Sequence, residues 1–138
     1  MDLDRTPDQI ARAASEEIRA LNHRTLAPGA FHGDDGFRGV APARLSSTVQ
    51  GILELTQRLP QTMQQLRRGL RQLEEEQAIR MTTGRDPDEE VATALRALLN
   101  AEEAFKAAEH ALRVAGAPMS AMGGYMDEEP AEDDAPVS

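Results

Sequence analysis

A regular spacing of apolar residues between positions 45 and 73 places the strongest constraint on the fold of this chain. The side chains recur in alternate steps of four and three, with one threonine inside the series: Leu45, Val49, Ile52, Thr56, Leu59, Met63, Leu66, Leu70 and Leu73. Their mean spacing of about 3.5 residues is the heptad value of helices that supercoil to the left. The sequence therefore predicts one long helix over about residues 43–81, with a continuous apolar stripe.

Pro60 lies inside this predicted helix. A proline lacks the amide that would bond to the carbonyl of Thr56, and its ring crowds that carbonyl. Because the apolar stripe stays in phase across Pro60, we expect a bent but continuous helix rather than two separate ones.

Two further helices are predicted on either side of the long one. Thr6-Pro7-Asp8-Gln9 combines a capping box with a proline at the first helical position, which predicts a helix over about residues 7–26. Asp86-Pro87 supplies a similar start for a third helix over about residues 87–115, which Gly116 and Pro118 are expected to end. Residues 27–41 are rich in glycine and proline and are predicted to form a loop.

These elements predict an all-α fold, a three-helix antiparallel bundle spanning residues 1–116. From the predicted lengths, the helix over 7–26 covers the first half of the long helix, and the helix over 87–115 covers the second half. Residues 117–138 are predicted to be a disordered tail whose six acidic residues hold most of the net charge of −9: Asp127, Glu128, Glu129, Glu132, Asp133 and Asp134.

Composition excludes several functional classes. The chain has no cysteine, which excludes disulfide and thiol chemistry, and no apolar run approaches the ~18 residues of a membrane-spanning helix. The N-terminal residues lack the pattern of a secretory signal, so we expect a cytoplasmic protein without a membrane partner. Outside the tail the net charge is only −3, which gives no electrostatic case for binding nucleic acid.

Candidate catalytic and metal-binding residues match no known pattern. His32, Asp34 and Asp35 share a loop, but their spacing fits neither a calcium loop nor a zinc site. Glu102 and Glu109 lie seven residues apart, as in a di-iron bundle, yet the required Glu-x-x-His is missing. His23 and His110 have no nucleophile at motif spacing, so they are interpreted as ordinary surface residues. We therefore predict no enzymatic activity, no cofactor and no metal.

Two other segments each allow a purely structural interpretation beside a functional one. Arg67, Arg68 and Arg71 precede three glutamates, an alternation of sign that is more typical of a solvated helix face than of a phosphate site. Residues 119–126 contain three methionines and a tyrosine, which fits either a short docking motif or a linker.

The leading functional hypothesis is a non-enzymatic helical scaffold or adaptor that acts through coiled-coil-like association, as a homodimer or with a protein partner. The alternative is a small acidic inhibitor or antitoxin-like regulator whose tail competes for a basic surface. A third possibility, an exported helical hairpin, lacks the Trp-x-Gly turn of such proteins and has Thr83-Gly84-Arg85 instead. The candidate partner-binding residues are Leu59, Met63, Leu66, Leu70, Leu73, Val91, Leu95, Leu98, Phe105 and Leu112.

Three segments carry a resemblance to known sequences: residues 6–14, residues 18–26, and Arg58-Leu59-Pro60-Gln61 with Gln65-Leu66. With these, most of residues 6–115 resembles small helical proteins of unknown function from streptomycetes and related actinobacteria. The resemblance implies that Pro60 is a built-in feature of the fold and that Asn22-His23 closes the first helix. It implies no activity and no site residue.

Overall fold

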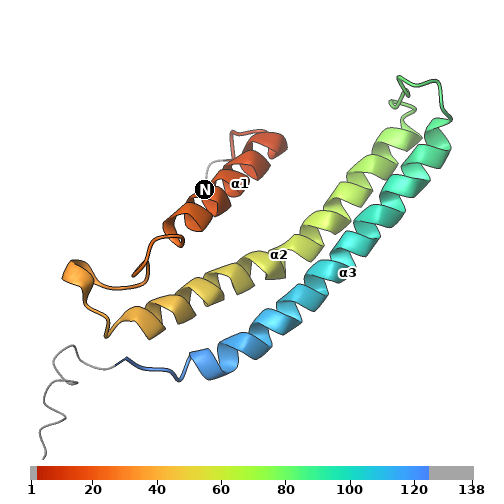
Figure 1. Ribbon diagram of the computed structural model, residues 1–138. Coiled ribbons are helices and arrows are strands. Elements are labelled where there is room, and N and C mark those ends of the chain that lie inside the picture. The colour runs from red at the N-terminus through yellow and green to blue at the C-terminus, as the bar shows by residue number, and fades with distance from the viewer. Residues whose placement is uncertain (1–2, 125–138) are drawn as a thin grey trace, which may run out of the picture. The chain divides into compact units, whose positions relative to one another are not determined.

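The computed structural model describes residues 3–124, and its regular elements are all helical (Figure 1). The α-helices are α1 (Pro7–Arg24), α2 (Ala41–Glu75) and α3 (Pro87–Met119), and a short 3-10 helix, η1, covers Asp34–Gly36. No β-strand occurs in this part of the chain. The predicted all-α class with three α-helices is confirmed, while residues 125–138 of the predicted acidic tail lie outside the described residues.

The chain divides into two compact units, and the division falls between Leu45 and Ser46 inside α2. Among the described residues, the first unit contains residues 3–45 and 122–124, and the second contains residues 46–121.

The second unit is an antiparallel hairpin in which α3 returns beside α2 (Figure 1). The helix α2 continues through Pro60 as one element and bends in its middle, as the in-phase apolar stripe predicts (Figure 1). Just before the proline, Thr56 is buried and its hydroxyl Oγ1 donates to the carbonyl oxygens of Ile52 and Leu53 at 3.0 and 2.9 Å. A threonine therefore fits this apolar stripe because the helix itself satisfies its hydroxyl.

Two contacts fix the register of the hairpin. The amide of Gln64 bonds to Glu102 at 2.7 Å, and a Cβ placed on Gly116 would lie 2.9 Å from Nε2 of Gln50. Gln50 lies as many residues before Gln64 on α2 as Gly116 lies after Glu102 on α3. The two contacts therefore agree on one antiparallel register, in which each step back along α2 is matched by one step forward along α3. The helix α3 thus covers the second half of α2, as predicted, and extends beyond it to the level of Gln50.

The end of α3 explains this greater reach. The predicted stop at residue 115 is wrong, because the helix continues through Gly116 and Pro118 to Met119. Gly116 is buried and lets α2 approach closely, so it serves packing rather than termination. Because Pro118 has no amide hydrogen, the carbonyl of Val114 is the one group that loses its partner in the helix. Val114 is 60% exposed, so water can satisfy that oxygen.

The helix α2 ends six residues before the predicted position 81. The amide of Gln77 bonds to the carbonyl of Glu74 at 3.0 Å and the amide of Ala78 to that of Leu73 at 2.9 Å, which is the Schellman pattern. Gln77 takes the left-handed conformation, with φ of 56°, at the position that glycine usually occupies. Three consecutive glutamates before it, at the negative end of the helix dipole, also oppose further helix.

We expect Gln77→Gly to stabilise the chain by about 0.5–1 kcal/mol, because glycine adopts the left-handed conformation without the strain of a side chain. The matched control is Gln72→Gly, inside α2, which is expected to cost about 1 kcal/mol through lost helix propensity. Urea denaturation followed by circular dichroism measures both. If both substitutions lowered the free energy of unfolding, the assigned helix end would be contradicted.

In the first unit, α1 begins as predicted and ends slightly earlier. The capping box forms, with the amide of Thr6 donating to Oε1 of Gln9 at 2.9 Å. The helix ends at Arg24 rather than at residue 26. Just after Arg24, the hydroxyl of Thr25 donates back to the carbonyls of Leu21 and Asn22. No residue of α1 is buried, and Ile10 is 40% exposed.

The segment predicted as a loop over residues 27–41 is more ordered than its composition indicates. It contains η1, in which Asp35 takes a left-handed conformation, and the amide of Gly33 bonds to the carbonyl of Phe37 at 2.7 Å. Nη1 of Arg44 donates to the carbonyl of His32 at 2.8 Å. The next helix, α2, starts at Ala41, two residues before the predicted position 43.

The apolar core of the described residues is thin. Leu53 and Val91, at 7% and 3% exposure, are the buried aliphatic side chains among residues 3–124. Several other large apolar side chains of the second unit stay exposed: Leu66, Leu73, Leu99 and Val114. The hairpin by itself therefore leaves part of its apolar surface exposed.

Candidate association surface

The candidate partner-binding residues fall into two groups in the structure. Val91 is buried, and most of the others are half-buried along the seam between the two helices: Leu59, Met63, Leu70, Leu95, Leu98, Phe105 and Leu112. Leu66 and Leu73 remain exposed, at 49% and 47%. The stripe thus holds the hairpin together, and these two leucines are the part of it that is most available to another molecule.

A buried charge cluster lies at the middle of the seam. Glu102 is 4% exposed, Arg67 Nη1 and Gln64 Nε2 both donate to its carboxylate, and Lys106 Nζ lies 3.3 Å from its Oε2. The hydrogen bond from Arg67, followed by that from Gln64, lowers the pKa of Glu102 from 4.5 to about 2. The same carboxylate raises the pKa of Lys106. Glu102 is therefore held ionised and clamps α3 to α2.

Sequence reasoning missed this cluster. The alternation of charge around Arg67 predicts a solvated face, but the side chain of Arg67 is only 15% exposed. A signal was present, because Glu102 occupies a stripe position of α3, four residues after Leu98 and three before Phe105. A carboxylate at such a position needs a cationic partner on the facing helix.

The cluster also shows which sides of the two helices meet. Consecutive helical residues lie about 100° apart, so Leu66 and Arg67 point to opposite sides of the seam, as do Ala101 and Glu102. Because Arg67 and Glu102 meet on one side, Leu66 and Ala101 share the other side. We call the side of the cluster the charged side.

The charged residues of the middle of the hairpin lie toward the charged side or point away from the seam. On α2 between residues 59 and 73 these are Arg67, Arg68 and Arg71, and on α3 between residues 91 and 112 they are Arg96, Glu102, Glu103, Lys106 and Glu109. The opposite side carries a leucine row on α2 and an alanine row on α3: Leu59, Leu66 and Leu73, with Ala94, Ala101 and Ala108. We call this side the uncharged face.

A second acidic contact lies where the two helices join. Burial, and then a hydrogen bond with the carboxyl of Asp88, raise the pKa of Glu74. Asp86 caps α3 by accepting the amide of Asp88 at 3.1 Å. Among residues 3–124, no group of three or more histidine or acidic side chains is arranged to hold a metal ion.

These two carboxyls have opposite effects on stability in acid. Glu102, whose pKa is lowered, stabilises the fold above about pH 4.5, and this contribution is lost as the pH falls toward 2. Glu74, whose pKa is raised, binds its proton more tightly in the folded state, so acidification toward pH 4.5 adds stability. We expect the melting temperature to rise slightly as the pH falls toward 4.5 and then to decline toward 2.

Thermal melts at half-unit pH intervals measure this profile. Glu74→Gln is expected to remove the rise, and Glu102→Gln is expected to weaken the decline. A Glu102→Gln profile that falls below pH 4.5 as steeply as the parent profile would contradict the assigned role of the carboxylate.

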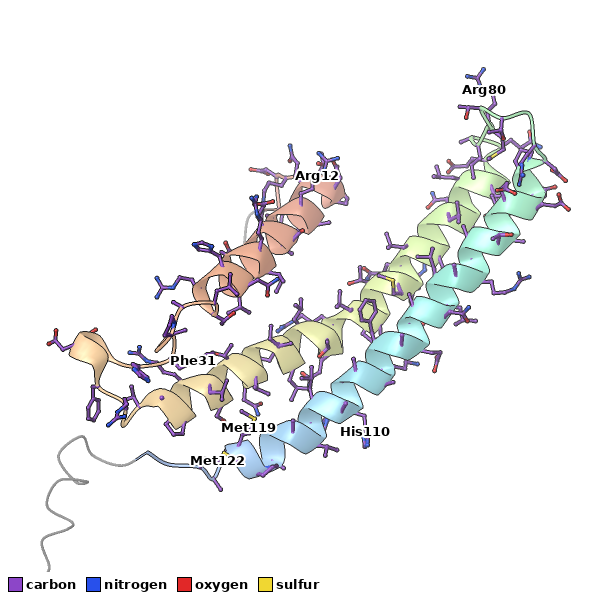
Figure 2. The ribbon with its side chains drawn as sticks, viewed as in Figure 1. Arg12, Phe31, Arg80, His110, Met119 and Met122 are labelled. Carbon is purple, nitrogen blue, oxygen red and sulfur yellow. The ribbon has the colours of Figure 1, made fainter. Side chains whose placement is uncertain are left out.

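The histidines lie away from the cluster. His110 is exposed, and Figure 2 shows it on the side of α3 that faces away from α2. His23 and His32 belong to the first unit, where they line a hollow of about 310 Å³ together with Arg24 and Arg44. The described histidines therefore include no general base next to the buried carboxylate.

No helix within residues 3–124 is long and apolar enough to cross a bilayer.

No family model, curated protein or solved structure matches the chain. The resemblance to small actinobacterial helical proteins stays a prediction.

Proposed function

We propose that the chain is a cytoplasmic, non-enzymatic helical scaffold or adaptor that associates with another helical protein surface through the uncharged face. One observation carries the proposal: Leu66 and Leu73 are half exposed on a face that has no charged residue, while the opposite side of the same hairpin is densely charged. Apolar surface of this kind, next to charged surroundings, supports a role in protein association.

The chemistry of the hairpin supports association over catalysis. Its buried carboxylate already has three donors, and its exposed apolar residues are arranged in helical rows that fit a further helix. The excess of acidic residues supports a protein partner rather than a nucleic acid.

Affinity capture with the tagged full chain tests the proposal. The double variant Leu66→Glu, Leu73→Glu places two charges on the uncharged face, and the matched control Arg68→Glu, Arg71→Glu changes charge on the other side. We expect the parent and the control to retain the same bound protein, including any second copy of the chain, and the face variant to lose it. Binding that survives in the face variant, or is absent from the parent, would overturn the proposal.

The alternative function is a small acidic inhibitor or antitoxin-like regulator that binds a basic partner. It is favoured by the six acidic residues between positions 127 and 134, which no basic residue accompanies after Arg113. Deletion of residues 127–138 separates the two functions. Loss of partner binding in the truncated chain favours the inhibitor, whereas retained binding favours the uncharged face.

A further inference from the structure

We infer that the partner of the uncharged face is a second copy of this chain, and that the two hairpins form a four-helix bundle around a two-fold axis parallel to their helices. In this arrangement the leucine row of each copy packs on the alanine row of the other. The inference rests on the proposed function, which requires only that the face binds a protein.

The first argument is that the two rows lie at matching levels. The register set by Gln64 with Glu102 places Leu66 level with Ala101. Because both rows repeat every seven residues, Leu59 is then level with Ala108, and Leu73 with Ala94. A two-fold axis along the helices keeps each level and exchanges α2 for α3. Every leucine of one copy therefore meets an alanine of the other at its own height.

The second argument is the difference in size between the rows. Leucines that faced leucines would hold the two hairpins apart, whereas leucines that face alanines let the helices approach and interdigitate. An interface with a two-fold axis must be complementary to itself, since each surface meets its own copy. A hairpin with one row of large and one of small residues at equal heights meets this condition.

The third argument is the absence of charge. A two-fold contact brings the same surface of both copies together, so a charge of one sign on the face would be repelled unless an opposite charge met it. The face has no charged residue between positions 59 and 73 of α2 or between positions 91 and 112 of α3. Self-association therefore buries no charged side chain of this part of the hairpin, and the charges remain on the outer side of the bundle.

The size of the face sets the strength of the contact. From Leu59 to Leu73 it runs about 21 Å along α2, and two packed helices are about 20 Å wide. Roughly 400 Å² per copy is less than a standard stable interface buries. We therefore expect a reversible dimer with a dissociation constant in the micromolar range rather than a permanent one.

Directed disulfide formation tests the pairing, because the chain contains no cysteine. A tagged Leu66→Cys chain and an untagged Ala101→Cys chain are mixed at equal concentration with oxidised glutathione. We expect the mixed disulfide between the two chains to exceed both same-residue disulfides. Arg68→Cys mixed with Glu103→Cys, two exposed positions on the charged side, is the control and is expected to remain uncoupled.

Light scattering over a range of concentrations provides the second measurement. We expect the mass of the parent to rise from 15.0 kDa toward twice that value, while Leu66→Glu stays at the lower mass with unchanged helical circular dichroism. If disulfides between two Leu66→Cys chains dominate, the leucine-on-alanine pairing is wrong. If the parent stays at 15.0 kDa throughout, the second copy is excluded. The proposed function then survives only if capture yields a different protein that depends on Leu66 and Leu73.

Discussion

Replacing Glu102 by alanine is expected to lower the melting temperature by on the order of 10 °C. The substitution removes the acceptor for Arg67 and Gln64 at a seam position where the carboxylate is 4% exposed. The guanidinium of Arg67, 15% exposed, then remains in the seam without its carboxylate partner, which costs more than the loss of an attraction in water. Thermal melts at pH 7 measure the loss.

The adjacent residue provides a matched control. Glu103 also pairs with Lys106, at 3.5 Å, but its side chain is 63% exposed, so Glu103→Ala is expected to change the melting temperature by only about 1–2 °C. The double variant Glu102→Ala, Arg67→Ala should lose less than the sum of the two single losses, since neither partner is left alone. Equal losses for Glu102→Ala and Glu103→Ala would mean that the buried cluster does not hold the hairpin.

The helix starts could be predicted from the sequence because their chemistry is local. The Thr6–Gln9 capping box and the Asp86 cap each need only a few consecutive residues, and both form in the structure. Continuity through Pro60 was also predictable, since the apolar stripe on either side keeps one phase.

The helix ends could not be predicted in the same way. A residue type that usually ends a helix is here kept inside one by packing, and the residue type that does end a helix has no strong preference for that position. Gly116 stays helical where α2 approaches closely. Gln77, in contrast, adopts a left-handed conformation that glycine would take with less strain. Local propensity is too weak to decide either position against tertiary contacts.

The candidate surface was predicted only in part. A heptad stripe identifies apolar positions but does not show whether they face the same chain or another one, and most of this stripe turned out to line the seam of the hairpin. Only the register of the two helices separates the positions that face the same chain from those that can face another one. Once Glu102 is known to meet Gln64 and Arg67, the exposure of Leu66 beside Ala101 follows. The sequence has the residues of both the seam and the uncharged face, and the contacts between helices assign each residue to one of them.

Leu53→Ala is expected to destabilise the chain by about 2–4 kcal/mol, because a leucine at 7% exposure loses its apolar burial and leaves a cavity. This is a large fraction of the stability expected for a small domain with few buried side chains. Leu99→Ala is the control, since Leu99 is 44% exposed and its truncation is expected to cost less than about 1 kcal/mol. Urea denaturation at one low protein concentration measures both, so that dimer dissociation does not contribute to the difference. Similar losses for the two variants would show that burial at Leu53 does not set the stability of the fold. A ratio of about three or more would show that the few buried side chains of this thin core hold the monomer together.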